Sequence, residues 1–384
     1  MCPCWRVSSV IAPEGAREAA SRSHRPEWRV RLWLRNGTTR LLPVKYGAVI
    51  KDLDSTTTIN VEIPTGLEPG LLDQDYLPAG SSISAEYRIR NATPWLRIAR
   101  CDIVSGAIAR PESTWVLSCV DRGRRIAKDD LKRSRMILRK APIAENIANI
   151  IRRTFPGINV EATGRATTME FPTPDDLDIT QGDPWALCKE LAAAAGAIVY
   201  EDCARSVFVV ENAPDLDDPV DSLVVGDGGS LTRYTIQHEM GPNMAIMEYV
   251  DADSNSVVRT GQAIDTSPTS PVAYQRVGTY IVTTEQARVK QAPGQADADL
   301  AALALLRRES SMMRRANLVH PQRPWLQPGE TVSIAYLGGP VEDQVIERVE
   351  IPMVTGEEQV TVLRTDMYQM SSPLPYSNNA EQEG

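Results

Sequence analysis

The sequence has few of the residues that build catalytic or metal sites. Only three histidines occur in 384 residues, and they are scattered, at His24, His238 and His320. No HExxH zinc motif and no GxSxG nucleophile turn is present. The densest carboxylate group lacks the spacing of a calcium loop, and consists of Asp175, Asp176, Asp178 and Asp183. We interpret it as a polar loop ending in a helix cap, and expect no catalytic residues, metal or cofactor.

Cysteine does not supply a metal site either. The six cysteines include a Cys2-Pro-Cys4 pair, but no second CxxC or histidine pair stands at zinc spacing. Cys101 and Cys119 lie on successive predicted strands, where a disulfide is geometrically possible, although we favour buried free thiols. The chain is long enough to form two or three domains with apolar cores of their own.

Long apolar runs and net positive charge are also absent. No run approaches the ~20 apolar residues of a membrane span, and residues 5–12 lack a signal-peptide pattern, so we expect cytoplasmic synthesis without export by that route. The net charge of −9 argues against stable nucleic-acid binding, which needs a basic surface. The short basic runs at 122–125 and 314–315 lie among acids and are interpreted as solvated faces.

What the sequence does contain is an internal similarity. Segment 77–87 matches segment 326–336, and a second block follows in the same order, 98–103 against 346–351. The matched positions are Leu77/Leu326, Gly80/Gly329, Tyr87/Tyr336, Arg100/Arg348 and Ile103/Ile351. Two copies of one β unit, far apart in the chain, predict two copies of one small β domain. Coincident turn chemistry before two unrelated strands is the alternative.

Residues 28–123 are predicted to form the first β domain, a barrel or sandwich. Asn36-Gly37 is the strongest short signal for a hairpin turn. Stretches of β-forming residues recur at regular spacing with Pro and Gly turns between them, at 28–34, 40–44, 48–50, 58–63, 82–89, 96–103 and 114–120.

Residues 124–222 change in character and predict an α+β insertion. Residues 143–153 place isoleucines on one helical face. A second helix is marked by Asp183 as N-cap, Pro184 at its first position and Gly196 just after its end. Segments 197–201 and 206–210 then predict a hairpin.

Residues 223–370 are predicted to form the second β domain. Residues 251–295 are rich in Asp, Ser, Thr, Pro and Gly, which predicts a long loop, and a helix follows at 296–315. The second β unit, 317–366, is shorter than the first, so we expect some strands of this domain to come from 223–282. The ends are interpreted as an N-terminal arm, or residues added by an upstream start codon (1–27), and a frayed tail (371–384).

Several short blocks occur in a specific order between residues 28 and 366. They are Asp183-Pro184-Trp185, Leu191-Ala192, Gly196-Ala197, Tyr200-Glu201-Asp202, 267–271 and 326–329. This series resembles the minor tail proteins of long-tailed actinobacterial phages and, behind them, the tail-tip or baseplate hub family. Two features depart from the family pattern: Arg205 stands where the hairpin turn normally has glycine, and residues 1–27 have no counterpart.

The resemblance implies a mainly β hub with two tube-like β-barrel domains and an α+β insertion, assembled as a homotrimer in the virion tail tip. Its partners would be the distal tail or tail-tube protein, the tape-measure protein, and other minor tail proteins or fibres. Such a hub would join a hexameric tail tube to a three-fold tip and line the DNA exit channel. A negatively charged wall suits a channel through which DNA slides.

Two other classes of function were weighed against the hub. A receptor- or carbohydrate-binding tail-tip component would favour clusters of exposed aromatic residues, and aromatics make up only 5% of the chain. A tail-associated cell-wall hydrolase would need a carboxylate pair or zinc ligands at recognisable spacing. We therefore predict a structural protein and not an enzyme.

Overall fold

The computed structural model describes most of the chain between Pro26 and Arg364. The described ranges are 26–53, 56–64, 80–90, 92–109, 114–128, 136–170, 177–179, 183–214, 218–225, 230–238, 241–251, 253–266, 272–289, 292–311, 314–336 and 341–364. Leu77, Asp175 and Asp176 lie outside these ranges, as do the arm before residue 26 and the tail after residue 364.

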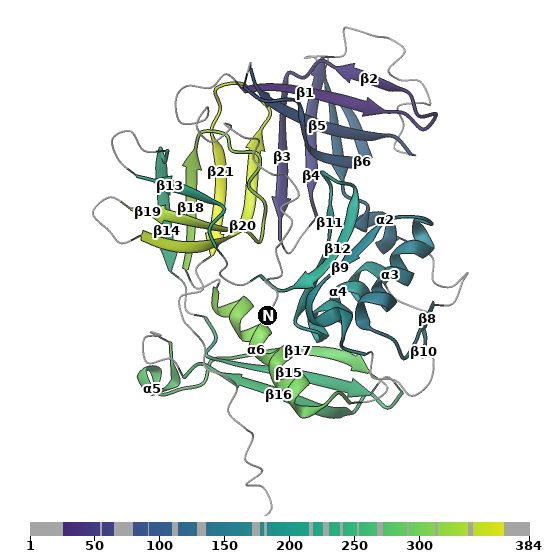
Figure 1. Cartoon of the computed structure of the whole chain (residues 1–384), viewed down its shortest axis with the longest axis vertical. Coiled ribbons are helices and arrows are strands. Elements are labelled where there is room, and N and C mark those ends of the chain that lie inside the picture. Colours follow the sequence, from purple (N-terminus) through teal and green to yellow (C-terminus); the bar gives the residue numbers. More distant parts are fainter. Residues whose placement is uncertain are drawn as a thin grey trace, which may run out of the picture.

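The largest element is a 13-stranded sheet that passes through both predicted β domains (Figure 1). Its main path runs β14-β18-β21-β20-β3-β4-β7-β6-β5-β1-β2, and β19 joins β13 to β20. The strands are β1 (Pro26–Trp33), β2 (Thr39–Leu42), β3 (Tyr46–Asp52), β4 (Thr58–Pro64), β5 (Ser82–Ile89), β6 (Leu96–Ala109), β7 (Thr114–Val120), β13 (Asp221–Val224), β14 (Arg233–His238), β18 (Arg314–His320), β19 (Thr331–Ala335), β20 (Val341–Pro352) and β21 (Gln359–Arg364).

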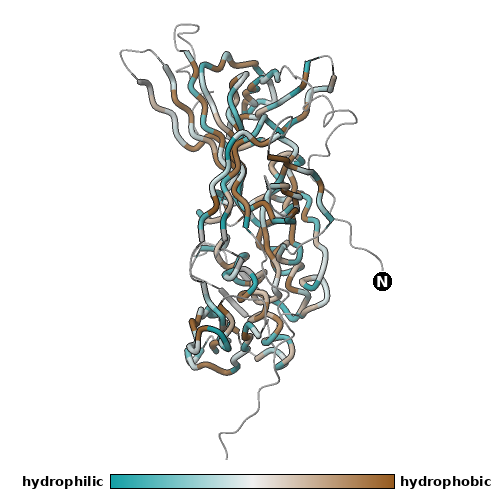
Figure 2. The backbone as a smooth tube through the Cα atoms, turned by 90° about the vertical axis from the view of Figure 1, so that its left-hand side faces the viewer, coloured by the Kyte–Doolittle hydropathy of each residue, from teal (hydrophilic) through white to brown (hydrophobic). Residues whose placement is uncertain are grey.

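The burial of β4 follows the alternation in its sequence. In β4, Ile59, Val61 and Ile63 are buried while the residues between them are not, which is the two-residue period of a strand with one covered face. Hydrophobic and hydrophilic stretches accordingly alternate along the strands in the side view of Figure 2. The turn between β1 and β2 places Gly37 at φ +83°, as its Asn-Gly sequence predicted.

The expectation of two barrel domains needs correction. The described strands form one sheet that does not close, with β14 at one end of its path and β2 at the other. The physical reason is that β20 pairs with β3. The two β domains therefore share a strand edge, and neither closes on itself among the described residues.

The insertion is an α+β unit beside this sheet. Asp183 caps α4 by accepting hydrogen bonds from the amides of Trp185 (2.8 Å) and Ala186 (3.1 Å), Pro184 stands at the first turn, and Gly196 follows the helix at φ +64°. These features confirm the predicted helix and the capping role of Asp183. The elements are α2 (Gly123–Ala127), β8 (Met136–Leu138), α3 (Ile143–Thr154), β9 (Val160–Ala162), η4 (Gly164–Thr167), β10 (Leu177–Ile179), α4 (Pro184–Ala194), β11 (Ala197–Asp202) and β12 (Val207–Asn212).

A third unit occupies the region where a long loop was expected. A separate sheet forms in the order β16-β15-β17, and α6 packs against it (Figure 1). A Cβ atom added at Gly261 of β16 would lie 2.0 Å from the Ala298 carbonyl oxygen of α6, so only glycine permits this contact. The prediction of a loop over 251–295 was therefore wrong. The elements are β15 (Met244–Asp251), β16 (Val257–Ile264), α5 (Tyr274–Val277), β17 (Val282–Val289) and α6 (Gln295–Ser311).

Candidate functional site

The two ends of the large sheet follow the same five-strand path. We call β3, β4, β7, β6 and β5 the first half-sheet, and β14, β18, β21, β20 and β19 the second half-sheet. Each set is given in spatial order, and neighbouring strands are antiparallel throughout. The outermost partners differ, because β1 pairs antiparallel with β5 whereas β13 pairs parallel with β19.

The hydrogen-bond registers of the two half-sheets also match. Where β6 pairs with β7, a bulge follows Ile103, and where β20 pairs with β21, a bulge follows Ile346. The amide of Ile103 donates to the carbonyl of Ser81 (3.1 Å), and the amide of Ile346 donates to the carbonyl of Glu330 (2.8 Å). Ile103 and Ile346 thus hold the same place in the two half-sheets.

The first predicted block of the repeat can be compared between the two half-sheets at its glycine and its tyrosine. Gly80 and Gly329 have φ values of +101° and +86°, and each stands two residues before the first residue of its strand. Tyr87 is fully buried on β5 and packs edge-on against Trp28, with ring centroids 5.0 Å apart. Tyr336 follows the last residue of β19 and is only partly buried. Leu326 is buried.

The second predicted block is displaced. Arg100 and Ile103 lie on β6, and Arg348 and Ile351 lie on β20, but the ladder register aligns Ile103 with Ile346, five residues before Ile351. The side chains of the two arginines also differ in role. Arg100 donates to Ser82 Oγ (2.9 Å) and stacks over Trp33, whereas Arg348 pairs with Glu350 (3.0 Å). The cause is the length of the hairpin, because the hairpin from Thr331 to Val345 is six residues shorter than the equivalent one from Ser82 to Asp102.

The two half-sheets meet at a seam between β20 and β3. Val349 to Pro352 pair with Lys51 to Ala48 in antiparallel register, and the ladder extends through Leu53 N to Glu347 O (3.0 Å) and Met353 N to Gly47 O (2.7 Å). Side chains reinforce the seam: Lys51 Nζ donates to Gln327 Oε1 (2.7 Å). Burial lowers the pKa of Lys51 to about 8.

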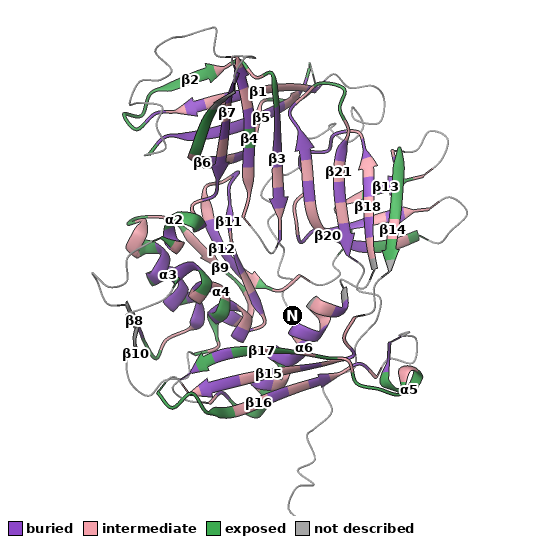
Figure 3. Cartoon of the chain, turned by 180° about the vertical axis from the view of Figure 1, so that it is seen from behind, coloured by how far each residue is buried: buried purple, intermediate pink, exposed green. Residues whose placement is uncertain are grey.

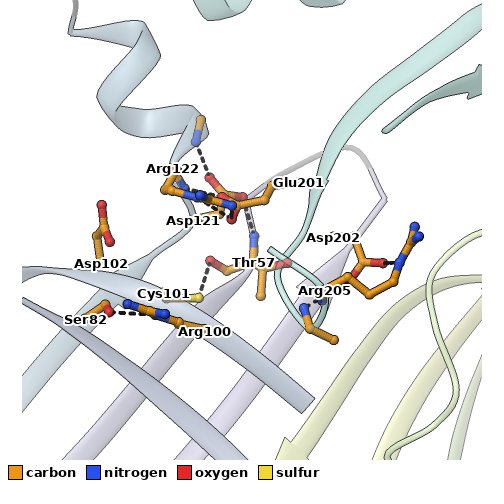
Figure 4. A network of polar contacts seen from close by, with 12 residues as sticks. Thr57, Ser82, Arg100, Cys101, Asp102, Asp121, Arg122, Glu201, Asp202 and Arg205 are labelled. Atoms are coloured by element: carbon orange, nitrogen blue, oxygen red, sulfur yellow. Dashed lines mark hydrogen bonds and ion pairs between the residues drawn. The ribbon is translucent and has the colours of Figure 1, made fainter. Parts of the chain in front are cut away.

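A buried ion pair joins the insertion to the first half-sheet (Figure 4). Glu201 of β11 accepts hydrogen bonds from the backbone amide of Arg122 (2.5 Å) and from its Nε (2.7 Å). Beside it, Asp121 accepts from the amide of Thr57 (2.9 Å). Burial raises the pKa of Glu201 to about 7 against the attraction of Arg122, and burial raises the pKa of Asp121 to about 6. Sequence reasoning missed this contact, which only tertiary proximity creates.

The β11–β12 hairpin fixes the insertion at a second point. Its tip reaches the large sheet, where Arg100 N donates to the carbonyl of Cys203 (2.9 Å), and Cys203 and Ala204 enter the core of that sheet. The departure noted at Arg205 is accommodated because the left-handed residue is Ser206, at φ +62°. Arg205 instead pairs with Asp202 (2.5 Å). Contacts at two separate points therefore fix the insertion against the large sheet.

The second half-sheet contains a buried polar cluster. His320 Nδ1 donates to the carbonyl of Pro321 (2.8 Å), because that oxygen can only accept, and Nε2 lies 2.9 Å from Thr361 Oγ1. Gln359 donates to Thr361 (3.3 Å) and accepts from the amide of Arg323 (2.8 Å). Burial lowers the pKa of His320 to about 4, so the ring is neutral and structural at neutral pH.

The described residues hold no group of three or more His, Cys, Asp or Glu placed to bind a metal ion. Cys101, Cys119, Cys188 and Cys203 are buried free thiols. No helix in the described part of the chain is both long and apolar enough to span a membrane. Arg122 and Arg125 of the basic run are engaged by Glu201 and Asp102, in contacts within the chain.

No protein-family model and no curated protein matches the chain. Solved structures do. A 43 kDa tail protein of prophage MuSo2 from Shewanella oneidensis shares 14% identity at a TM-score of 0.60, covering 88% of this chain and 98% of its own. A tail protein of Neisseria meningitidis shares 13% at 0.62, covering 88% and 97%. The E. coli c3393 protein, described as a type VI secretion component similar to the T4 tail proteins gp27 and gp5, shares 10% at 0.50, covering 89% and 79%.

These similarities concern the fold, because the identities are low. They extend over most of each chain, so the large sheet, the insertion and the third unit together form an arrangement also found in phage tail proteins. The organisms give no support to the actinobacterial origin that the sequence blocks indicated. The chain therefore shares its fold with solved phage tail proteins.

Proposed function

We propose that this chain is a structural virion protein, the hub of a phage-type tail tip or baseplate. The observation that carries the proposal is the pair of half-sheets with matching path and register, joined at their edges inside a fold shared with tail proteins. On this proposal the two half-sheets are copies of one ancestral β unit. On this proposal the repeat positions of the sequence have no chemical role.

A duplicated unit solves a problem of symmetry. Three chains present six similar half-sheets, which match a hexameric tail tube on one face, while one insertion per chain gives three-fold character to the other. The partners on this proposal are two further copies of the chain, a tail-tube or distal tail protein, a tape-measure protein, and other minor tail proteins or fibres. The site of action is the tail tip of the virion.

The ring would enclose a DNA exit channel bordered by the half-sheets. The net charge of −9 supports this assignment, since like charge keeps phosphates from binding to the wall and leaves transit fast. The insertion would lie outside the ring. Neither a catalytic step nor stable nucleic-acid binding is part of this function.

The test is the mass of the purified chain by light scattering, together with imaging of intact tails. We expect three times the monomer mass and density for both β domains around the channel at the tail tip. A monomer placed at the tail periphery contradicts the hub.

One observation favours a different function, a carbohydrate-binding tip component. Tyr274 and Tyr280 stack on each other with ring centroids 4.2 Å apart. The exposed fraction is 39% for Tyr274 and 49% for Tyr280. Exposed aromatic faces are suited to binding sugar rings. A pull-down on host glycans, repeated with Tyr280→Ala, separates this function from the hub, for which the substitution has no effect on assembly.

A further inference from the structure

In the seam an edge of β20 pairs with β3, and the equivalent edges of the two half-sheets lie on β6 and β14. In the second half-sheet, β19 covers β20 only as far as Val345, and the rest of that edge pairs with β3. In the first half-sheet, β5 covers β6 only as far as Asp102. No described strand pairs with the corresponding edge of β6 over residues 106–109.

The edge that would complete this pair lies at the far end of the same sheet. β14 holds the place in the second half-sheet that β3 holds in the first, and among the described strands it pairs only with β18. Its residues Arg233, Tyr234, Thr235 and Gln237 are exposed (Figure 3). An open strand edge is a template for pairing with another chain.

We propose that residues 106–109 of one chain pair antiparallel with β14 of the next chain, in the register of the seam. This inference rests on the proposed function, the three-chain ring. Replacing each seam residue by its equivalent in the other half-sheet gives the predicted partners Gly106/His238, Ala107/Gln237, Ile108/Ile236 and Ala109/Thr235. The occupant of each edge is thus a second copy of this chain.

The proposal makes every junction between half-sheets alike. The junction within a chain and the junction between chains would use equivalent strands in the same direction and register. The two kinds of junction would alternate around the ring, six in all. At the centre of the new junction, Ile108 would stand opposite Ile236, as Ile351 stands opposite Val49 in the seam. The contact is heterologous, because it joins two different edges. Heterologous contacts close into a ring when the rotation from one unit to the next divides a full turn, and six half-sheets need a rotation of about 60° each.

The register identifies the best position for a covalent test. The bonds from Leu53 N to Glu347 O and from Met353 N to Gly47 O mark the hydrogen-bonded pairs of the seam. Glu350 and Ile50 are therefore a non-hydrogen-bonded pair, the kind whose Cα atoms lie closest, about 4.5 Å apart. Their equivalents in the proposed junction are Ala107 and Gln237, both exposed in the single chain. A disulfide fits this spacing.

The experiment uses the full chain with Cys2→Ser and Cys4→Ser as the parent. Ala107→Cys with Gln237→Cys should give covalent dimers and trimers under mild oxidation, seen on non-reducing gels. The matched control combines Ala107→Cys with Arg233→Cys, which is exposed on the same face of β14 but four residues away, about 13 Å along the strand. The control should crosslink at least tenfold less.

Light scattering on the same samples separates the outcomes. A trimer that crosslinks at 107/237 and not at 107/233 supports the junction. A trimer in which neither pair crosslinks, or both do equally, overturns the junction and leaves the hub intact. Crosslinked ladders that grow beyond three chains support the edge pairing and contradict the three-chain ring. A monomer without crosslinks overturns both.

Discussion

The two half-sheets share a path and a register but differ in what fills their cores. In the first, Ile63 of β4 lies opposite Trp115 of β7, and both are buried. At the equivalent place in the second, His320 lies opposite Gln359, and both are completely buried. The same position thus holds an apolar pair in the first half-sheet and two hydrogen-bonded polar residues in the second.

The difference shows which features the architecture requires. Strand order, the bulge after Ile103 or Ile346 and the left-handed glycine before the central hairpin occur in both halves. The chemistry of the core varies, provided that buried polar groups find partners, because an unpaired one costs about 1–3 kcal/mol. Matching in this protein is therefore clearer in the ladder of hydrogen bonds than in residue identity.

The largest expected effect is a loss of stability when Tyr87 is truncated, compared with the same change at Tyr336, its counterpart in the sequence. Tyr87→Ala should lower the free energy of unfolding by about 3–5 kcal/mol, because a fully buried ring leaves a cavity. Tyr336→Ala should cost less than half of that, because this ring is only partly buried. Denaturant unfolding measures both, and Tyr87→Phe, which keeps the ring, is the control. Equal losses would mean that the two tyrosines are interchangeable in packing as well as in sequence.

The polar core of the second half-sheet should make the stability of the protein fall in acid, through His320. The folded-state pKa of His320, about 4, lies below its ordinary value of 6.5, so the unfolded chain binds the proton more readily. The contribution of His320 to stability is then present above pH 6.5 and lost as the pH falls towards 4. It amounts to on the order of 2–3 kcal/mol.

The variant His320→Gln tests this assignment. Unfolding free energies measured from pH 4 to 7 should show a shallower slope for the variant than for the natural chain. A slope that does not change would place the acid sensitivity elsewhere.

The anchor of the insertion should respond to pH with the opposite sign. The folded-state pKa of Glu201, about 7, lies above its ordinary value of 4.5. Its contribution is present below pH 4.5 and lost as the pH rises towards 7, and we expect about 2 kcal/mol. Glu201→Gln should remove this loss in the same titration, and Glu145→Gln, exposed on α3, should leave it unchanged. A Glu201→Gln profile that falls as steeply as the natural one contradicts the assignment.

The smallest effect concerns the shared turn. Gly80→Ala and Gly329→Ala should each lower the free energy of unfolding by about 1 kcal/mol, because both glycines have positive φ. Gly294→Ala, where φ is outside the left-handed region, serves as the control. If one glycine tolerates alanine and the other does not, the two turns are not equivalent.

Much of the local structure could be predicted from the sequence. Asn36-Gly37, Asp183-Pro184 and Gly196 each determine a turn or helix end through a bond or dihedral within a few residues. The burial of β4 follows its alternation, and β5 and β7 match the predicted bounds. The third unit escaped prediction because only Ala287 and Val289 of β17 are buried, which leaves little hydrophobic pattern.

What the sequence by itself determined was therefore local: turns, caps and most strands of the two β units. Only the tertiary structure decided that β20 pairs with β3, that Ile103 corresponds to Ile346, and that Glu201 meets Arg122. Each of these depends on residues far apart in the chain. Strand edges and buried charges take whichever partner the folded chain brings within hydrogen-bond distance, and no short stretch of sequence specifies that partner.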